Sequence, residues 1–115
     1  MRGELAVGEY FPDASVYCRY LAKQGLAYYY LGQHEYEQAI KPLEELAAQS
    51  DFQAFGIAGL VVVYANLGDD EKANDANGRL SIEMRKSLSK QSPQMFELLN
   101  KTLDELFERA QAERR

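Results

Sequence analysis

The sequence predicts an all-α protein of about five helices, paired as antiparallel hairpins. Two observations support this fold class. The chain repeats itself at an interval of 34 residues, and apolar side chains recur at the three- and four-residue spacing of amphipathic helices. The length of 115 residues fits a single domain, 1–115, and a composition of 46% hydrophobic and 27% charged residues is typical of a globular protein.

The repeat emerges when the sequence is aligned with itself at an offset of 34 residues, without any gap. Residues 14–53 form the first unit and residues 54–90 the second. Conservative pairs such as Leu21 and Phe55 accompany the identities. The identical pairs are Gly25 and Gly59, Leu26 and Leu60, Tyr30 and Tyr64, Glu37 and Glu71, Ala39 and Ala73, and Leu46 and Leu80.

Each unit reads as two helices joined by a short turn. In the first unit we expect a helix over 21–33, begun early near residue 14 with Asp13 as its N-cap, and a second helix over 36–49. Residues 1–13 are expected to be a loose N-terminal segment. In the second unit we expect helices over 55–66 and 70 to about 90, separated by a turn at Gly68, a residue suited to a helix C-terminus.

The C-terminal segment 92–112 predicts one further amphipathic helix that caps the second unit. Ser92 is its expected N-cap and Pro93 its first helical residue. We expect its apolar stripe to pack along the preceding helix, with contact to a second chain as the alternative. The stripe is Phe96, Leu99, Leu103, Leu106 and Ala110, and its expected partners are Ala76, Leu80, Met84 and Leu88.

This pattern resembles the tetratricopeptide repeat (TPR) family over about 68 of the 115 residues. The first unit carries the family's pattern at Leu26, Ala27, Tyr30, Tyr36, Ala39 and Leu43, and the second at Leu60, Val61, Tyr64, Gly68 and Ala73. The sequence departs from the family at Lys23 and Ile57, which stand where the family has Trp, and at His34 in place of a turn glycine. The resemblance implies a solenoid of helix hairpins with a concave groove lined by the first helix of each unit.

By the same resemblance, the positions that line the groove are mostly apolar here. The family's clamp for a C-terminal carboxylate is missing, because Gln24, Tyr28, Gly59 and Val62 occupy its places. Gly25 and Gly59 lie within predicted helices, where glycine is unfavourable, and two explanations are possible. Either a partner approaches the backbone closely at these residues, or the helices pack tightly against each other. The expected partner-binding residues are Leu21, Gln24, Gly25, Tyr28, Leu31, Phe55, Ala58, Gly59, Val62, Ala65 and Asn66.

An apolar groove of this kind predicts a protein–protein interaction module that binds a partner protein or peptide. The alternative is a homodimer that uses the same groove and the C-terminal amphipathic helix, since two repeats are few for a stable solenoid. A third reading is a sensory domain of a longer chain that binds a small molecule.

Other functions are not expected from this sequence. The net charge of −5 argues against nucleic acid, and the longest apolar stretch, 59–65, is too short to cross a membrane. No signal peptide is recognisable, so we expect a cytoplasmic protein. His34 and Cys18 are the sole histidine and cysteine, which predicts no metal, no cofactor and no catalytic residue, and hence no enzyme.

Overall fold

The computed structural model describes residues 12–114, and the side chains of residues 15–114. This part of the chain is entirely helical, as predicted, but contains six helices where about five were expected. They are α2 (Pro12–Gly32), α3 (Tyr36–Ala47), α4 (Gln53–Asn66), α5 (Asp70–Gly78), α6 (Ile82–Gln91) and α7 (Pro93–Glu113). The expectation of a loose segment at 1–13 lies almost wholly outside the described residues.

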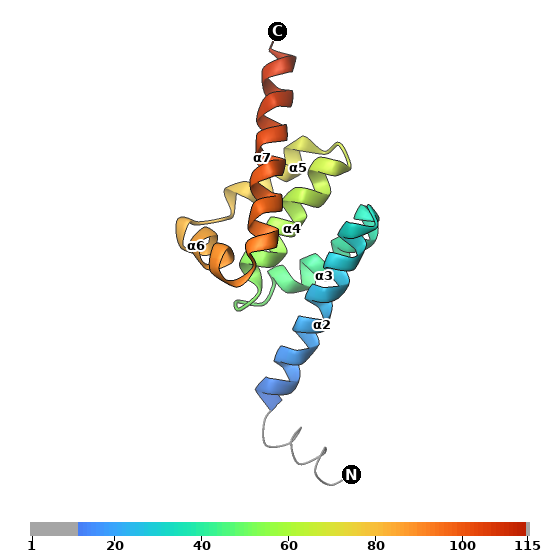
Figure 1. Cartoon of the computed structure of the whole chain (residues 1–115), viewed down its shortest axis with the longest axis vertical. Helices are drawn as coiled ribbons and strands as arrows, with labels where there is room; N and C mark the ends of the chain where they lie inside the picture. The colour runs from blue at the N-terminus through green and yellow to red at the C-terminus, as the bar shows by residue number, and fades with distance from the viewer. Residues whose placement is uncertain (1–11, 115) are drawn as a thin grey trace.

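Helix α4 is the centre of the molecule, and α3, α5, α6 and α7 all pack against it. Its sequence explains this position, because apolar residues cover all of its sides and ten of its residues are buried. Helices α2 and α7 point away from this body at opposite ends, which gives an elongated molecule of 66 × 29 × 19 Å (Figure 1).

The turns that close the two hairpins have the same backbone geometry. His34 and Gly68, 34 residues apart, both have positive φ angles, of 59° and 84°. The amide of the next residue then donates to a carbonyl five residues earlier, from Glu35 to Tyr30 and from Asp69 to Tyr64, each over 2.9 Å. This is the pattern of a helix that ends on a left-handed residue.

The two predicted N-caps, Asp13 and Ser92, do not cap their helices in the structure. Asp13 lies inside α2, which the structure describes from Pro12 onward, so this residue is not its N-cap. Helix α7 begins at Pro93 with Ser92 as N-cap residue, as predicted, but the Ser92 hydroxyl makes no capping hydrogen bond. It accepts one from Gln24 of α2 instead.

The prediction of one continuous helix from 70 to about 90 was wrong. The chain breaks after Gly78, and Ser81 caps a new helix by accepting a hydrogen bond from the Met84 amide. Arg85 holds the break closed through hydrogen bonds from its Nη2 to the Asn77 carbonyl and side chain, at 3.0 and 2.8 Å.

The break also changes the packing of the last helix. Helix α7 was expected to lie along Ala76, Leu80, Met84 and Leu88, but it packs chiefly on α4 and less on α6. Its buried residues are Met95, Leu99, Thr102 and Leu106. Arg109 fixes it further by binding the Ala65 carbonyl and the Asp70 carboxylate, which lie at the end of α4 and the start of α5.

Candidate functional site

The structure places the predicted groove residues in two environments. On α2, Leu21 and Gly25 are exposed, Gln24 and Tyr28 are half-buried, and Leu31 is buried. On α4 the predicted residues are buried, apart from the exposed Asn66, whose side-chain amide bonds to the Val62 carbonyl of its own helix. The buried ones are Phe55, Ala58, Gly59, Val62 and Ala65.

The two groove glycines have different surroundings although they share a repeat position. A Cβ atom on Gly59 would collide with the Leu43 side chain of α3, so tight helix packing accounts for this glycine. A Cβ atom on Gly25 would meet nothing within 4 Å. Helix packing within the described chain therefore gives no reason for a glycine at residue 25.

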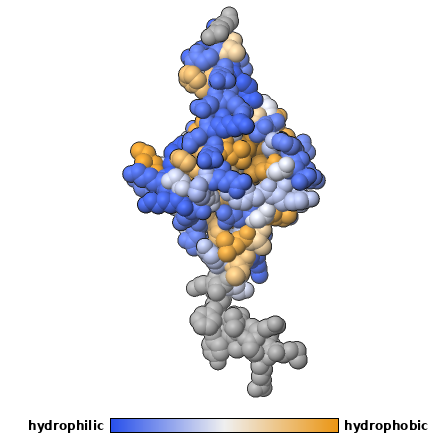
Figure 2. Space-filling view, viewed as in Figure 1, coloured by the Kyte–Doolittle hydropathy of each residue, from blue (hydrophilic) through white to orange (hydrophobic). Residues whose placement is uncertain are grey.

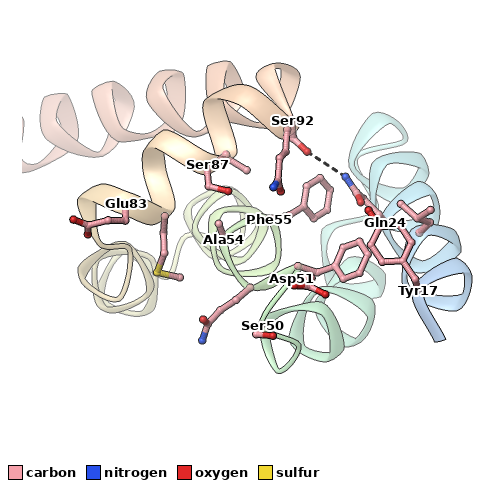
Figure 3. Close-up of a pocket in the computed structure, with 15 residues that line it drawn as sticks. Tyr17, Gln24, Ser50, Asp51, Ala54, Phe55, Glu83, Ser87 and Ser92 are labelled. Atoms are coloured by element: carbon pink, nitrogen blue, oxygen red, sulfur yellow. Dashed lines mark hydrogen bonds between the residues drawn. The ribbon is translucent and has the colours of Figure 1, made fainter. Parts of the chain in front are cut away.

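A contact between α2 and the start of α7 divides the predicted groove across its middle. Gln24 Nε2 donates to Ser92 Oγ over 3.2 Å, drawn as a dashed line in Figure 3. The next turn of α2 brings Tyr28 against the same corner. Burial raises the pKa of Tyr28, and hydrogen bonds with the Ser92 side chain and the Met95 backbone partly offset this rise. One hollow lies on each side of this contact.

The first hollow, which we call the α2–α6 hollow, has a volume of about 500 Å³. Figure 3 shows α2 along one side of it, α6 along the other and α4 between them. Leu21, Gln24 and Phe55 are the predicted groove residues that line it. The remaining lining residues are Tyr17, Ser50, Asp51, Phe52, Gln53, Ala54, Glu83, Met84, Ser87, Leu88, Gln91 and Ser92.

Aromatic packing holds the α2 side of this hollow in place. The Phe52 ring, 6% exposed, lies 5.2 Å from the Tyr17 ring and 5.8 Å from the Tyr20 ring, centre to centre. The Phe55 ring, 4% exposed, meets Tyr28 edge-on at 5.1 Å. Such pairs stabilise beyond their buried area. The floor of the hollow is therefore apolar and formed by packed aromatic rings.

The rim of the hollow combines exposed apolar groups with negative charge. Tyr17 is 49% exposed and Leu21 is 44% exposed. In Figure 2 an orange patch lies low on the body, next to the grey atoms, over the first half of α2. The charged residues that line the hollow are the carboxylates Asp51 and Glu83, with no Lys or Arg among the lining residues.

The second hollow lies between the end of α2 and α7 and has a volume of about 380 Å³. Its walls include Tyr28, Leu31 and Leu98, and its charges are mixed, with Glu97 beside Lys101. A smaller hollow of about 220 Å³ borders it and reaches Val62 and Asn66. Phe52 and Phe55, which form the floor of the first hollow, do not line this region.

Sequence reasoning missed several residues of the α2–α6 hollow. Tyr17 lies one turn before Leu21, so helical spacing could have found it. Phe52 lies just before α4, in a segment that the repeat pattern assigned to no helix. Met84 and Leu88 were assigned to contact with the last helix, and only the break before α6 brings them to this hollow.

Metal and membrane features are lacking in the part of the chain that the structure describes. No three His, Cys, Asp or Glu side chains between residues 12 and 114 gather closely enough to hold a metal ion. The sole histidine, His34, is exposed and bonds through Nδ1 to the Tyr36 hydroxyl at 2.8 Å. None of the described helices combines the length and the apolar character needed to cross a membrane.

Comparisons with known proteins identify no relative of this chain. No family model matches it, and no curated protein or solved structure is similar to it. The function is therefore inferred from the chain's own geometry.

Proposed function

We propose that this chain is a non-catalytic TPR-like interaction module that binds a segment of a partner polypeptide in the α2–α6 hollow. The observation that carries the proposal is the exposure of Tyr17 and Leu21 beside a floor of buried Phe52, Phe55 and Leu88. Exposed apolar groups next to a preformed apolar floor are typical of binding sites.

The chemistry of the hollow favours a particular kind of segment. A volume of about 500 Å³ with aromatic walls suits one or two bulky apolar side chains. Asp51 and Glu83 on the rim favour a neighbouring Lys or Arg in the ligand, because opposite charges attract and steer encounter. The amide and hydroxyl groups of Gln24, Gln91 and Ser87 offer hydrogen bonds to a peptide backbone.

The matching turns support the TPR-like part of the proposal. His34 and Gly68 take up the same left-handed conformation at the same repeat position. Residues other than glycine seldom adopt this conformation, and histidine does so more readily than most, so His34 can take the place of the turn glycine. Two sequence units with one turn geometry are what a repeat architecture requires.

The experiment is a selection of peptides from a random displayed library against the purified chain. We expect enriched peptides to combine an aromatic or large aliphatic residue with Lys or Arg. Leu21→Asp should weaken their binding at least tenfold. Because Leu21 is 44% exposed, this change leaves the folded core intact.

The matched control is Leu26→Asp. Leu26 is on the same helix and equally exposed, at 43%, but does not line the hollow. Binding that survives Leu26→Asp and is lost in Leu21→Asp supports the proposal. Equal binding by both variants contradicts it, and circular dichroism must give the same helicity for all three proteins.

Self-association is the second candidate, because α7 carries an exposed apolar side chain on its far end. Phe107 is 64% exposed and follows Leu106, the last buried residue of the helix. If two copies join through α7, light scattering should give about twice the chain mass of 13.1 kDa, and Phe107→Glu should halve it. A single-chain mass at all concentrations would rule this candidate out.

A further inference from the structure

The first helices of the two repeat units have corresponding faces with different surroundings. On α4, the face that carries Gly56 and Gly59 is covered by α3. A Cβ atom on Gly56 would lie 2.7 Å from the Leu43 carbonyl oxygen and would also collide with the Ala47 backbone. A Cβ atom on Gly59 would collide with the Leu43 side chain. Leu60 and Val63 on the same side of α4 are 4% and 0% exposed.

The corresponding residues of α2, 34 positions earlier, are exposed within the part of the chain that the structure describes. They are Ala22, Gly25, Leu26 and Tyr29. Leu26 is 43% exposed and Tyr29 is 59% exposed, and the space above Gly25 is open to at least 4 Å. Cys18 continues the same exposed face one turn earlier. We call these five residues the outer face of α2.

The outer face of α2 also lacks charge, unlike other exposed helix faces of this molecule. Among the residues of α2 the charged ones are Asp13, Arg19 and Lys23, and Lys23 pairs with Glu45 of α3 at 2.9 Å. From residue 24 to the end of the helix there is no charge at all. The exposed side of α7, of equal length, carries Glu97, Lys101, Asp104, Glu105, Glu108 and Arg109. An uncharged, partly apolar face on an exposed helix is typical of an interface.

We propose that the outer face of α2 receives an amphipathic α-helix of a partner protein, packed as α3 packs on α4. The occupant is an apolar helix side with Leu and Ala four residues apart, as Leu43 and Ala47 are on α3. Gly25 lets this helix approach closely, as Gly59 does for Leu43. Ala22 has the Cβ atom that Gly56 lacks, so the partner helix lies farther out at that end.

This docking face is separate from the α2–α6 hollow. Leu21, on the hollow, and Leu26, on the outer face, point about 140° apart around the helix axis at 3.6 residues per turn. One partner could thus occupy the hollow while a second helix covers the outer face. The inference does not depend on the proposed function of the hollow.

The test uses the α3 sequence itself as the probe. A synthetic peptide of residues 35–50 carries a fluorophore and a lactam bridge between Glu37 and Lys41. These two side chains are exposed and one turn apart, so the bridge stabilises the helix without blocking its apolar side. We expect saturable binding to the full chain by fluorescence anisotropy, and none for a peptide with Leu43→Asp.

Gly25→Glu should weaken peptide binding at least tenfold, because it puts a charge in the middle of the outer face. The matched control is Gly78→Glu on α5, where a Cβ atom also meets nothing within 4 Å and binding should not change. Leu21→Asp should also leave the binding of the peptide unchanged. This result would distinguish the outer face of α2 from the α2–α6 hollow as the site of peptide binding.

Three results would overturn the proposal. The first is no saturable binding of the peptide at concentrations up to about 1 mM, a weak limit for a helix docking in a groove. The second is equal binding by the wild type and Gly25→Glu, which would mean that the peptide exchanges with the chain's own α3. The third is a dimer that Gly25→Glu dissociates and that oxidation links through Cys18, since a second copy would then be the occupant.

Discussion

Adding one methyl group at three glycines should change stability in opposite directions, depending on which helix carries the glycine. Gly25→Ala should stabilise the protein by about 1 kcal/mol, because alanine favours a helix over glycine by that amount and the added Cβ meets nothing within 4 Å. For a domain near 100 residues this raises the melting temperature by about 4 °C.

The same change on α4 should be unfavourable. In Gly59→Ala the new Cβ collides with the fully buried Leu43 side chain, and overpacking typically costs about 1–3 kcal/mol. The helix-propensity gain of about 1 kcal/mol offsets part of this, which leaves a net loss of up to about 2 kcal/mol. Gly56→Ala should be the most destabilising, because its Cβ meets backbone atoms of Leu43 and Ala47, which no side-chain rotation can relieve.

The assay is urea denaturation of the four proteins followed by far-ultraviolet circular dichroism. Similar slopes of free energy against urea would show that the surface exposed on unfolding is unchanged, so the midpoints can be compared. We expect the order Gly25→Ala, wild type, Gly59→Ala, Gly56→Ala, from most to least stable. If Gly56→Ala is as stable as Gly25→Ala, the close contact between α3 and α4 is refuted.

Two further predictions concern the turns and the half-buried Tyr28. A left-handed residue that has a Cβ atom costs about 1–2 kcal/mol. His34→Gly should therefore raise the free energy of unfolding by about 1 kcal/mol in thermal melts, and Gly68→Ala should lower it. A lower stability of His34→Gly would contradict this. Burial raises the pKa of Tyr28 above 10.0, so the stabilisation it gives is full below that pH and is lost as the pH rises through the folded pKa. Tyr28→Phe should therefore melt with a weaker dependence on alkaline pH than the wild type, and identical profiles would exclude this role.

Local sequence signals sufficed for the hairpins but not for the second half of the chain. The turns at His34 and Gly68 and the start of α7 at Pro93 each depend on a few adjacent residues. The stripe through Ala76, Leu80 and beyond suggested one long helix because its spacing continues across the break. Gly78 and Ser81 were the opposing signals, and hydrogen bonds between residues eight positions apart, from Arg85 to Asn77, stabilise the break.

The candidate site was predicted on α2 and at Phe55 of α4, but not on α6. The resemblance to the TPR family implied Leu21, Gln24 and Phe55 as groove residues, and all three line the α2–α6 hollow. The hydrogen bond between Gln24 and Ser92 divides the groove. It forms because α6 ends next to α2 and so brings Ser92 close to Gln24. Such a contact, between residues 68 positions apart, has no signature in the local sequence.

The late position of α7 in the chain has a consequence for synthesis. Helix α4 is the most apolar helix described, and α7, which packs against it, is completed about 40 residues later at Leu106. Ribosomes add about 5–20 residues per second, so roughly two to eight seconds pass between the synthesis of α4 and that of the α7 residues that pack against it. During that interval the nascent chain exposes an aggregation-prone surface, and a chaperone that shields it would find its binding site at residues 53–66.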